Sequence, residues 1–473
     1  MKYLVGENIF NFNSGTEFSE IQRLKALQKA GVKAQIVTRN YNRLLGQSME
    51  AHGLKQGDVI NMYDFFQGTT DFKRKEVSLR LLESTPREDY HIVGIDNNSS
   101  DLRYQGKTIA HIHVMPATVG LVGDIEYLDD VGHKAMTEYW DWRGFKSMVE
   151  TYHPDGTVAT QRYLRLDGTT AVEVVHMYIN HQVQPSMWRL YNYYGHNYTF
   201  DTENQLFTLF LNELNQKEQS TFISDRRSLD QCILSIANPK QTVAALHSLT
   251  FNNFKNPKAG ILPACQLPLN QGSKKFDKVV FPTEDQVKDV SKVVADHDNF
   301  VAAADSAIAE PDEKPRELGK KPKLVYRGML STNKNILGLV NAFKDVHKKI
   351  PDATLSMQGY FTDPKYQQAV NDQISKLGLK DSVKIVPYSP DDKLYDGATL
   401  FINASDNEAF GMNMLESMGH GVPVVTYAVP YVTNNLVRDD VNGCVVKNRS
   451  PNNLASQAVS VIANQTKYHD LSA

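Results

Sequence analysis

The spacing of hydrophobic residues at the start of the chain changes from that of a strand to that of a helix and back. Residues 3–5 form an apolar run, and apolar side chains then recur at helical spacing over 18–27. A second apolar run, 35–38, follows Gly31. Strand, helix and strand in this order are typical of the start of a doubly wound α/β domain.

The pattern over residues 75–198 is typical of antiparallel β structure instead. Alternating segments at 158–166 and 170–178 lie next to Asp-Gly turn sequences that end at Gly156 and Gly168. We therefore expect a β-rich insertion in the first α/β domain. Aromatic residues are frequent here, and we expect them to form a core or a subunit interface rather than a surface that stacks on sugars. They are Tyr139, Trp140, Trp142, Phe145, Trp188, Tyr191, Tyr193 and Tyr194.

The α/β pattern returns near residue 202 and continues to the end of the chain. Further strands of the first domain are expected at 221–224, 243–248 and 278–281. A stretch rich in Ala, Pro, Glu and Lys at 303–321 is typical of a linker. Strands of the second domain are expected at 323–326, 353–357, 383–386, 400–403 and 423–427. The predicted domains are thus 1–74 with 199–315, the insertion 75–198, and 316–473.

Composition and charge narrow the classes of function. The 473 residues carry a formal net charge of −3, so the overall charge gives no reason to expect a nucleic acid or an anionic membrane as partner. No apolar stretch has the length of a signal-peptide core or a membrane span. A cytoplasmic protein is therefore expected, with at most peripheral contact at the inner face of the membrane.

Metal-ligating patterns are weak. Cys232, Cys265 and Cys444 are scattered without CxxC spacing, which argues against a disulfide framework or a zinc site. His111 and His113 share one face of an expected strand, but no third ligand accompanies them. We therefore expect no metal site.

The candidate site with the clearest layout is a pair of glutamates, Glu408 and Glu416, eight positions apart between two apolar strands. Glu408 is expected in a loop and Glu416 on the helix that follows. This layout puts the backbone N–H groups of Phe410, Gly411 and Met412 at a helix N-terminus, where a nucleotide diphosphate can be held. Glu416 would then accept ribose hydroxyls, with Glu408 near the transferred group. The alternative is a favourable charge at a helix start and a solvated helical residue.

The run 408–416, with the sequence Gly-Val-Pro-Val-Val at 421–425, resembles the E-x7-E signature of the retaining glycosyltransferases of family 4. Within that family the chain resembles the poly(glycerol-phosphate) and wall teichoic acid α-glycosyltransferases and the protein O-GlcNAc transferases of bacterial surface adhesins, both of which have a β-rich insertion in the first domain. The resemblance implies two facing Rossmann-like domains, the GT-B fold. It also implies transfer of GlcNAc or glucose from a UDP-sugar to Ser/Thr of a surface protein or to teichoic acid, with no metal or other cofactor.

Residues outside the glutamate pair also match the family. Gly15, between the first strand and the first helix, would let the backbone approach a donor phosphate. Its neighbour Ser14 would bind the donor too, and Ser14 with Glu17 also predicts a capping box. His247 matches a histidine near the donor sugar. Lys334 matches the lysine that neutralises the departing diphosphate.

Several positions depart from the family pattern. Met329 stands where the family has an arginine. Arg327 lies two residues earlier, on the same face of an extended segment, and could substitute for it; the alternative is a surface residue. Ala409 and Val432 replace glycines. The alternative function is therefore a catalytically weakened paralogue that acts as the acceptor-binding or stabilising subunit of an active glycosyltransferase complex. A phosphorylase or epimerase on the same fold is a further alternative.

Overall fold

The computed structural model describes residues 1–78, 89–253, 256, 259–269, 275–308, 315–389 and 391–473. They form two compact units. One unit combines residues 1–13 with 24–243, and the other combines 14–23 with 244–473. The boundaries of these two units differ from those of the three domains predicted from the sequence. The predicted domain boundaries therefore stay a prediction.

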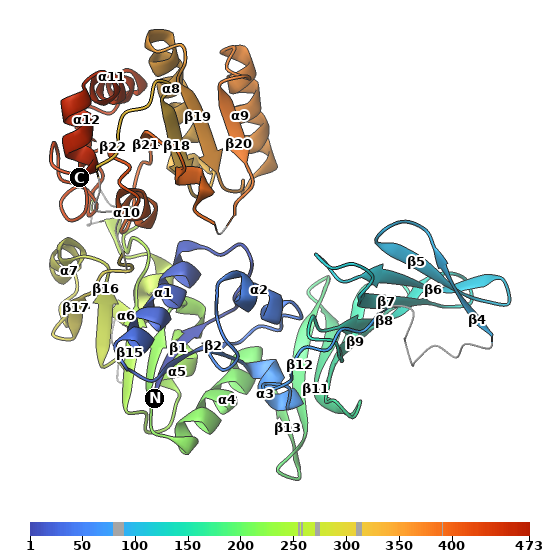
Figure 1. Cartoon of the computed structure of the whole chain (residues 1–473). Helices are drawn as coiled ribbons and strands as arrows, with labels where there is room; N and C mark the ends of the chain where they lie inside the picture. The colour runs from blue at the N-terminus through green and yellow to red at the C-terminus, as the bar shows by residue number, and fades with distance from the viewer. Residues whose placement is uncertain (79–88, 254–255, 257–258, 270–274, 309–314, 390) are drawn as a thin grey trace. The chain divides into compact units, whose positions relative to one another are not determined.

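The first sheet has seven strands in the order β17-β16-β15-β14-β1-β2-β3 (Figure 1). Their bounds are β1 Lys2–Gly6, β2 Ala34–Thr38, β3 Val59–Asn61, β14 Thr221–Ser224, β15 Gln241–Ala245, β16 Lys278–Phe281 and β17 Phe300–Ala302. Strand β1 is parallel to both β2 and β14, and the strand order reverses between β1 and β14. A reversal of this kind creates the crevice in which doubly wound folds bind ligands.

Most strands predicted for this sheet are confirmed, at 3–5, 35–38, 221–224 and 278–281. The strand predicted at 243–248 is wrong at its end, because β15 stops at Ala245. The apolar run continues to Leu246, whose N–H still donates to the carbonyl oxygen of Val280 (2.9 Å). His247 therefore lies in the loop after the strand.

Helices between these strands begin at side-chain caps where the sequence offers them. Their bounds are α1 Gly15–Lys29, α2 Leu45–Ala51, α3 Met62–Gln67, α4 Glu203–Lys217, α5 Asp230–Leu234, α6 Gln266–Leu269 and α7 Glu284–Ser291. The hydroxyl group of Thr283 accepts the N–H of Gln286 (3.2 Å) at the start of α7. Thr202 caps α4 in the same way.

The C-terminal sheet has six parallel strands in the order β20-β19-β18-β21-β22-β23. Their bounds are β18 Lys323–Arg327, β19 Thr354–Gln358, β20 Val383–Val386, β21 Leu400–Asn403, β22 Val424–Tyr427 and β23 Gly443–Val446. The surrounding helices are α8 Ile336–Lys349, α9 Pro364–Lys376, α10 Met412–Gly419, α11 Pro451–Ile462 and α12 Gln465–Ser472 (Figure 1). This strand order is that of the Rossmann fold, with its reversal between β18 and β21.

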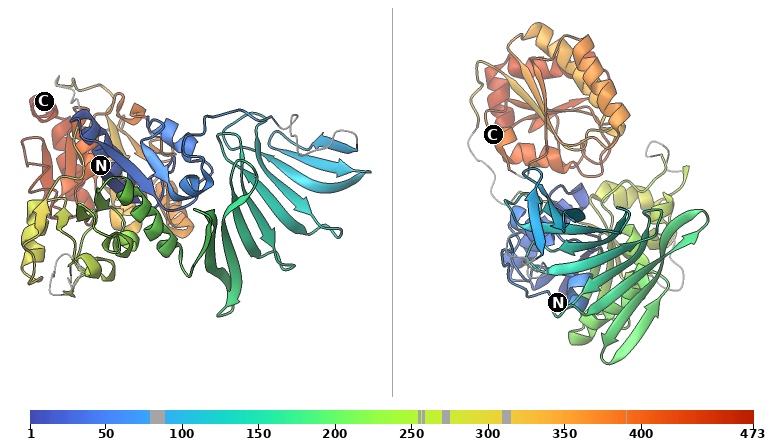
Figure 2. Two further views of the ribbon diagram at one scale, coloured as in Figure 1. Left: turned by 90° about the horizontal axis from the view of Figure 1, so that it is seen from below. Right: turned by 90° about the vertical axis from the view of Figure 1, so that its right-hand side faces the viewer.

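A ten-stranded antiparallel meander, β4 to β13, lies in the sequence between β3 and β14 (Figure 2). The bounds are β4 Tyr90–Gly94, β5 Ser99–Tyr104, β6 Lys107–Val114, β7 Val122–Leu128, β8 Lys134–Trp140, β9 Lys146–Tyr152, β10 Val158–Leu164, β11 Thr170–Ile179, β12 Gln182–Tyr193 and β13 His196–Phe200. The sequence therefore predicts the antiparallel class of this segment correctly.

The two predicted turns of the meander have the same chemistry. Asp155 accepts the N–H and hydroxyl of Thr157, and Asp167 accepts the same two groups of Thr169. The glycine in each turn has a positive φ, 82° for Gly156 and 83° for Gly168. Glycine adopts this left-handed conformation at little cost, so the Asp-Gly sequences set the register of β9, β10 and β11.

Helix α3 attaches the antiparallel sheet to the rest of its unit. The buried amide of Gln67, the last residue of α3, donates to the carbonyl oxygens of Ser147 (2.8 Å) and Leu164 (2.7 Å). Arg143 adds an ion pair with Asp64 of the same helix at 2.7 Å. Buried backbone oxygens thereby obtain partners, which makes this docking specific.

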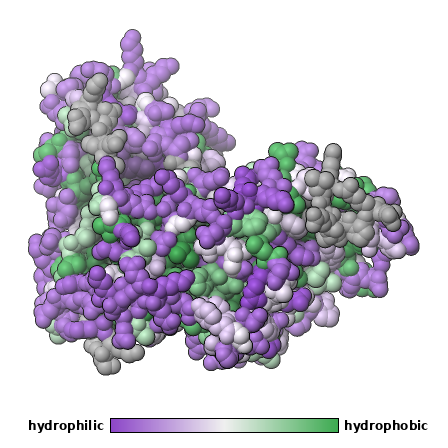
Figure 3. Space-filling view, turned by 60° about the horizontal axis from the view of Figure 1, so that its bottom comes forward, coloured by the Kyte–Doolittle hydropathy of each residue, from purple (hydrophilic) through white to green (hydrophobic). Residues whose placement is uncertain are grey.

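The aromatic residues of the meander divide between core and surface. Trp142 and Phe145 are buried, in line with the expected core, whereas Tyr194 is 74% exposed. Met177 and Tyr178 are exposed as well. Figure 3 shows a largely polar face on which smaller apolar patches occur. No helix among the described residues is long and apolar enough to cross a membrane.

Gly144 offers a test of the connection between β8 and β9. Its φ is 97°, and a Cβ added there would lie 1.7 Å from the carbonyl oxygen of Lys75. Gly156 has a similar φ of 82°, but a Cβ added to it would meet no atom within 4 Å. We expect Gly156→Ala to cost about 1 kcal/mol of unfolding free energy through backbone strain, and Gly144→Ala at least about 2 kcal/mol more through the clash.

Tryptophan fluorescence during urea unfolding measures this difference, because Trp140, Trp142 and Trp188 all lie in the segment 134–193 and report on the antiparallel sheet. Equal costs for the two alanine variants would contradict the close approach of Lys75.

Candidate functional site

The candidate site forms at the carboxyl ends of β18 and β21, the neighbouring strands between which the order of the C-terminal sheet reverses. Arg327 is the last residue of β18, and Lys334 follows in the next turn. Asn403 ends β21, and Glu408 follows in the loop that leads to α10. Ligands of open α/β sheets bind at this kind of edge.

Lys334 and Glu408 form an ion pair across the two loops, with Nζ 2.7 Å from Oε1. Their side chains are only 19% and 10% exposed. The N–H of Asp406 also donates to the carbonyl oxygen of Asn333 (3.0 Å), which joins the same loops through the backbone. The loop after β18 and the loop after β21 are therefore held as one surface.

Helix α10 begins at a glycine that its surroundings require. Gly411 has a φ of 88°, and a Cβ there would lie 2.9 Å from Cε of Met414 and 3.2 Å from Cγ1 of Val432. Val432 is fully buried against this helix start. The backbone groups of Phe410, Gly411 and Met412 thus lie at the N-terminus of α10, as the sequence predicts. At Val432 the isopropyl group fills space that a glycine would leave open.

Arg327 lies in a cluster of acceptors. Its guanidinium group is 2.7 Å from Oε1 of Glu416 and 3.2 Å from Oδ1 of Asp392, and it donates to the carbonyl oxygen of Ser389 at 2.7 Å. The hydroxyl of Tyr395 donates to the other carboxylate oxygen of Glu416 (2.9 Å). With only 6% of its surface exposed, Arg327 is not a surface residue, and that alternative is wrong.

Burial changes the proton affinity of this cluster. Burial raises the pKa of the Glu416 carboxyl group, although the charge of Arg327 opposes the rise. Burial also raises the pKa of the Tyr388 hydroxyl to about 12, again against Arg327, whose guanidinium lies 5.4 Å from the Tyr388 ring centroid. Glu416 is therefore not an isolated helical residue, because Arg327 and Tyr395 hold its carboxylate, although 36% of its side chain is exposed to solvent.

The two cations thus serve different glutamates, Arg327 with Glu416 and Lys334 with Glu408. The sequence interpretation missed the other partners of Arg327, namely Tyr388, Ser389, Asp392 and Tyr395. One signal was available, since an arginine that ends a buried strand must find a carboxylate. The spacing of residues in the sequence does not indicate which loop brings the further partners of Arg327.

The start of α1 belongs to the same compact unit. The N–H of Ser14 donates to Oε2 of Glu17 (2.9 Å), which is one half of the predicted capping box, and the hydroxyl of Ser14 accepts the N–H of Thr16 (3.3 Å). A Cβ on Gly15 would lie 3.8 Å from Sδ of Met412, an ordinary contact. The structure therefore brings Gly15 close to the start of α10.

His247 and the paired histidines of the meander have carboxylate partners. Nδ1 of His247 lies 2.8 Å from Oδ1 of Asp305. His111 pairs with Asp101 and His113 with Asp124, so these two histidines contact different carboxylates. No group of three or more His, Cys, Asp or Glu side chains in the described part of the chain could hold a metal ion.

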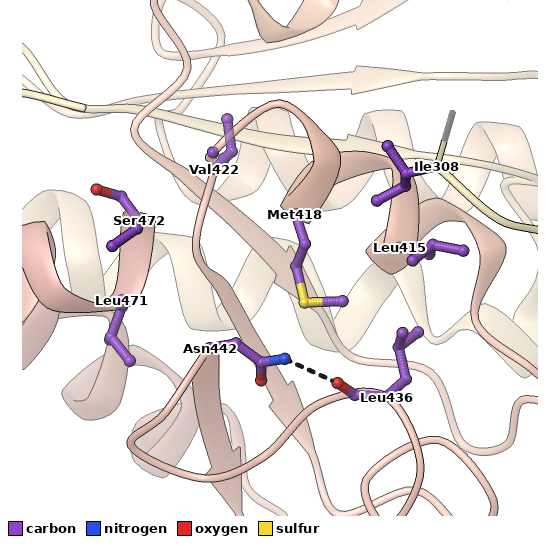
Figure 4. A pocket seen from close by; sticks show the side chains of 10 residues that line it. Ile308, Leu415, Met418, Val422, Leu436, Asn442, Leu471 and Ser472 are labelled. Atoms are coloured by element: carbon purple, nitrogen blue, oxygen red, sulfur yellow. Dashed lines mark hydrogen bonds between the residues drawn. The ribbon is translucent and has the colours of Figure 1, made fainter. Parts of the chain in front are cut away.

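A cavity of about 230 Å³ lies elsewhere in the C-terminal part (Figure 4). Leu415 and Met418 of α10 line it together with residues of the 436–442 loop and the end of α12. The amide of Asn442 donates to the carbonyl oxygen of Leu436 there. None of the ten described lining residues has a charged side chain, so the cavity lacks the chemistry of the glutamate site.

The comparisons with known proteins agree with this location. Residues 308–473 match the family Glycosyl transferases group 1. This part of the chain contains both glutamates, Arg327 and Lys334. It therefore carries a group 1 glycosyl transferase domain.

Two curated relatives are similar over different lengths. The poly(glycerol-phosphate) alpha-glucosyltransferase of Bacillus subtilis is 28% identical over 199 residues, which are 42% of this chain and 29% of that protein. The UDP-N-acetylglucosamine–peptide N-acetylglucosaminyltransferase GtfA subunit of Streptococcus gordonii is 20% identical over 444 residues, which are 91% of this chain and 84% of that subunit.

Among solved structures, the pneumococcal O-GlcNAc transferase GtfA in complex with UDP and GlcNAc has a TM-score of 0.84 at 17% sequence identity. The alignment covers 100% of this chain and 93% of that one. The overall fold is therefore that of the GT-B glycosyltransferases.

Removal of the negative charge of Glu416 should destabilise the structure around the Arg327–Glu416 pair. Glu416→Gln keeps the shape but leaves the buried guanidinium with the more exposed Asp392, so we expect a cost of about 2 kcal/mol. Hydrogen exchange of a peptide that covers β18 should then rise about thirtyfold. Asp381→Asn, the same kind of change at an exposed position, is the control. Equal exchange in both variants would contradict a stabilising pair.

Proposed function

We propose that the chain is a retaining glycosyltransferase of family 4 that moves GlcNAc or glucose from a UDP-sugar to a hydroxyl group. One observation carries the proposal: a group 1 glycosyl transferase domain has two glutamate–cation pairs at the strand-order reversal of its sheet. That edge is where this class of sheet binds nucleotides.

In this proposal Lys334 provides the electrostatic stabilisation of the departing UDP. Its ammonium group has three donors, and the contact with Glu408 leaves others that can meet phosphate oxygens. The backbone N–H groups of Phe410, Gly411 and Met412 add the partial positive charge of the start of α10. These groups can stabilise the charge of the diphosphate, and we propose no role for a metal ion.

The two glutamates have separate tasks. Glu408 lies beside Lys334, and we assign it to hydroxyl groups of the transferred sugar. Glu416 is oriented by Arg327 and Tyr395, and its carboxylate oxygens can each accept a further hydrogen bond from ribose hydroxyls. Arg327 is then a residue that orients Glu416 rather than a direct replacement for an arginine at position 329.

The transfer itself requires little side-chain acid–base chemistry. The acceptor oxygen forms a bond to the anomeric carbon on the face that UDP leaves, while the bond from that carbon to the phosphate oxygen breaks. The acceptor proton moves to the departing phosphate oxygen, so the charges balance without a separate base. The protein contributes orientation and charge stabilisation. We assign His247, Ser14 and Gly15 to the donor side of this arrangement.

The acceptor is proposed to be Ser/Thr of a surface protein or a teichoic acid polymer, since relatives named for both kinds of acceptor are similar to this chain. The antiparallel sheet is proposed to guide it. The protein is proposed to act in the cytoplasm, with contact at the inner face of the membrane.

A catalytically weakened subunit is the second candidate function. Met329 stands at the position of the family arginine, and the guanidinium of Arg327 is engaged by Glu416, Asp392 and Ser389. The similar GtfA protein is itself named a subunit. This candidate predicts little transfer by the chain alone and restored transfer with a paralogous glycosyltransferase.

A donor screen tests the proposal. We expect mass spectrometry to detect sugar addition to a Ser/Thr-rich peptide or to poly(glycerol-phosphate) with UDP-GlcNAc or UDP-glucose. Transfer that requires the paralogue favours the subunit function, and conversion of the donor without any acceptor favours an epimerase. Absence of transfer from both donors, with and without the paralogue, would refute the proposed activity.

Removal of the positive charge should slow transfer by a factor of about 100 to 1,000 in Lys334→Ala, because the departing diphosphate loses its main counter-charge. Glu408→Gln, which keeps the side-chain shape, should also reduce the rate strongly. Lys344→Ala, which removes an exposed lysine from α8, is the matched control. Rates equal to that control would rule out the assigned roles.

A further inference from the structure

A buried histidine–carboxylate pair lies in the loops that follow two strands of the seven-stranded sheet. Nδ1 of His247, in the loop after β15, is 2.8 Å from Oδ1 of Asp305, which follows β17. The two side chains are 6% and 10% exposed. The pair joins positions that are 58 residues apart, and its members come from loops at the same end of the sheet.

Helix α1 fixes the segment that carries Asp305. The hydroxyl of Ser19, a fully buried residue of α1, donates to the backbone carbonyl oxygen of Asp305 at 2.6 Å. The next residue, Ser306, hydrogen-bonds to Gln22 of the same helix. The N–H of Ala303 still bonds to the carbonyl oxygen of Phe281 at 2.9 Å. Hydrogen bonds therefore hold the backbone before and after Asp305, and they limit where its carboxylate can lie.

The geometry determines which ring nitrogen of His247 carries a hydrogen. An ionised carboxylate can only accept, so Nδ1 must donate. In the neutral ring Nε2 is then the nitrogen without a hydrogen. A carboxylate at this distance also fixes the plane of the ring, since rotation about the side chain would break the bond.

We propose that Asp305 is a positioning residue for His247, whose imidazole it holds in the Nδ1–H form with a fixed ring plane on the donor side of the site. The role in transfer rests on the proposed function. The choice of tautomer by Asp305 does not. A carboxylate that orients an imidazole in this way recurs where histidines act on substrates.

Nuclear magnetic resonance of ¹⁵N-histidine-labelled protein tests the tautomer without any substrate. The His247 signals are assigned from their loss in His247→Gln. We expect the wild type to show a protonated Nδ1 and an unprotonated Nε2 at alkaline pH, and Asp305→Asn to lose this preference. Asp298→Asn, the same change at an exposed position of the preceding loop, should leave the signals unchanged. An unaltered tautomer in Asp305→Asn would overturn the inference.

Kinetics separate positioning from a merely structural role. We expect Asp305→Asn to lower kcat for transfer by a factor of about 10 to 100 with little change in KM for the UDP-sugar, because a misplaced group affects the reacting geometry more than ground-state binding. In a His247→Ala background the same substitution should have no further effect. A full additional loss in that background would overturn the inference, because Asp305 would then act independently of His247.

The experiments distinguish failure of the proposed function from failure of the inference about Asp305. If the chain transfers no sugar, the proposed function fails, and the tautomer measurement still decides whether Asp305 orients His247. If Asp305→Asn does not fold, Asp305→Glu replaces it, because glutamate keeps the carboxylate. The Glu variant should retain the Nδ1–H form, and a switch to Nε2–H would overturn the inference.

Discussion

Two partly buried charge pairs hold the carboxyl ends of β18 and β21 in one arrangement, Arg327 with Glu416 and Lys334 with Glu408. Removing a cation from water is costly unless a carboxylate and further hydrogen bonds compensate it. Helix α10 can therefore dock only where Glu416 reaches the guanidinium group, and its preceding loop only where Glu408 reaches the ammonium group. Because these strands meet where the strand order reverses, the same pairs determine the geometry of the edge at which folds of this kind bind ligands.

The same constraint governs how the antiparallel sheet is attached. Gln67 gives two buried carbonyl oxygens their donors, and Arg143 pairs with Asp64 on the helix that carries Gln67. Apolar contacts alone would allow α3 to slide over the sheet, whereas directional bonds permit one position. At both places the hydrophobic core supplies the driving force, and the satisfaction of polar groups selects the arrangement.

The sequence predicts the strands well where an apolar run is bounded by turn residues, as for β14, β16 and the hairpin turns at Gly156 and Gly168. It fails at the end of β15, which stops at Ala245, whereas the predicted strand includes Leu246 and the two polar residues after it. It also cannot find the partners of Arg327 or His247. Those contacts join residues tens of positions apart and depend on loop conformation, which periodicity does not encode.

The presence of methionine at position 329, with the arginine at position 327, affects the charge of the candidate site. Arg327 is neutralised by Glu416, and Lys334 by Glu408. With Asp392 also beside Arg327, the described side chains of the two pairs carry no excess of positive charge. A diphosphate would therefore depend more on the N-terminus of α10 and on the remaining donors of Lys334 than in a site with a further arginine. Weak ground-state binding of UDP is compatible with catalysis, because only stabilisation gained as the diphosphate departs accelerates the reaction.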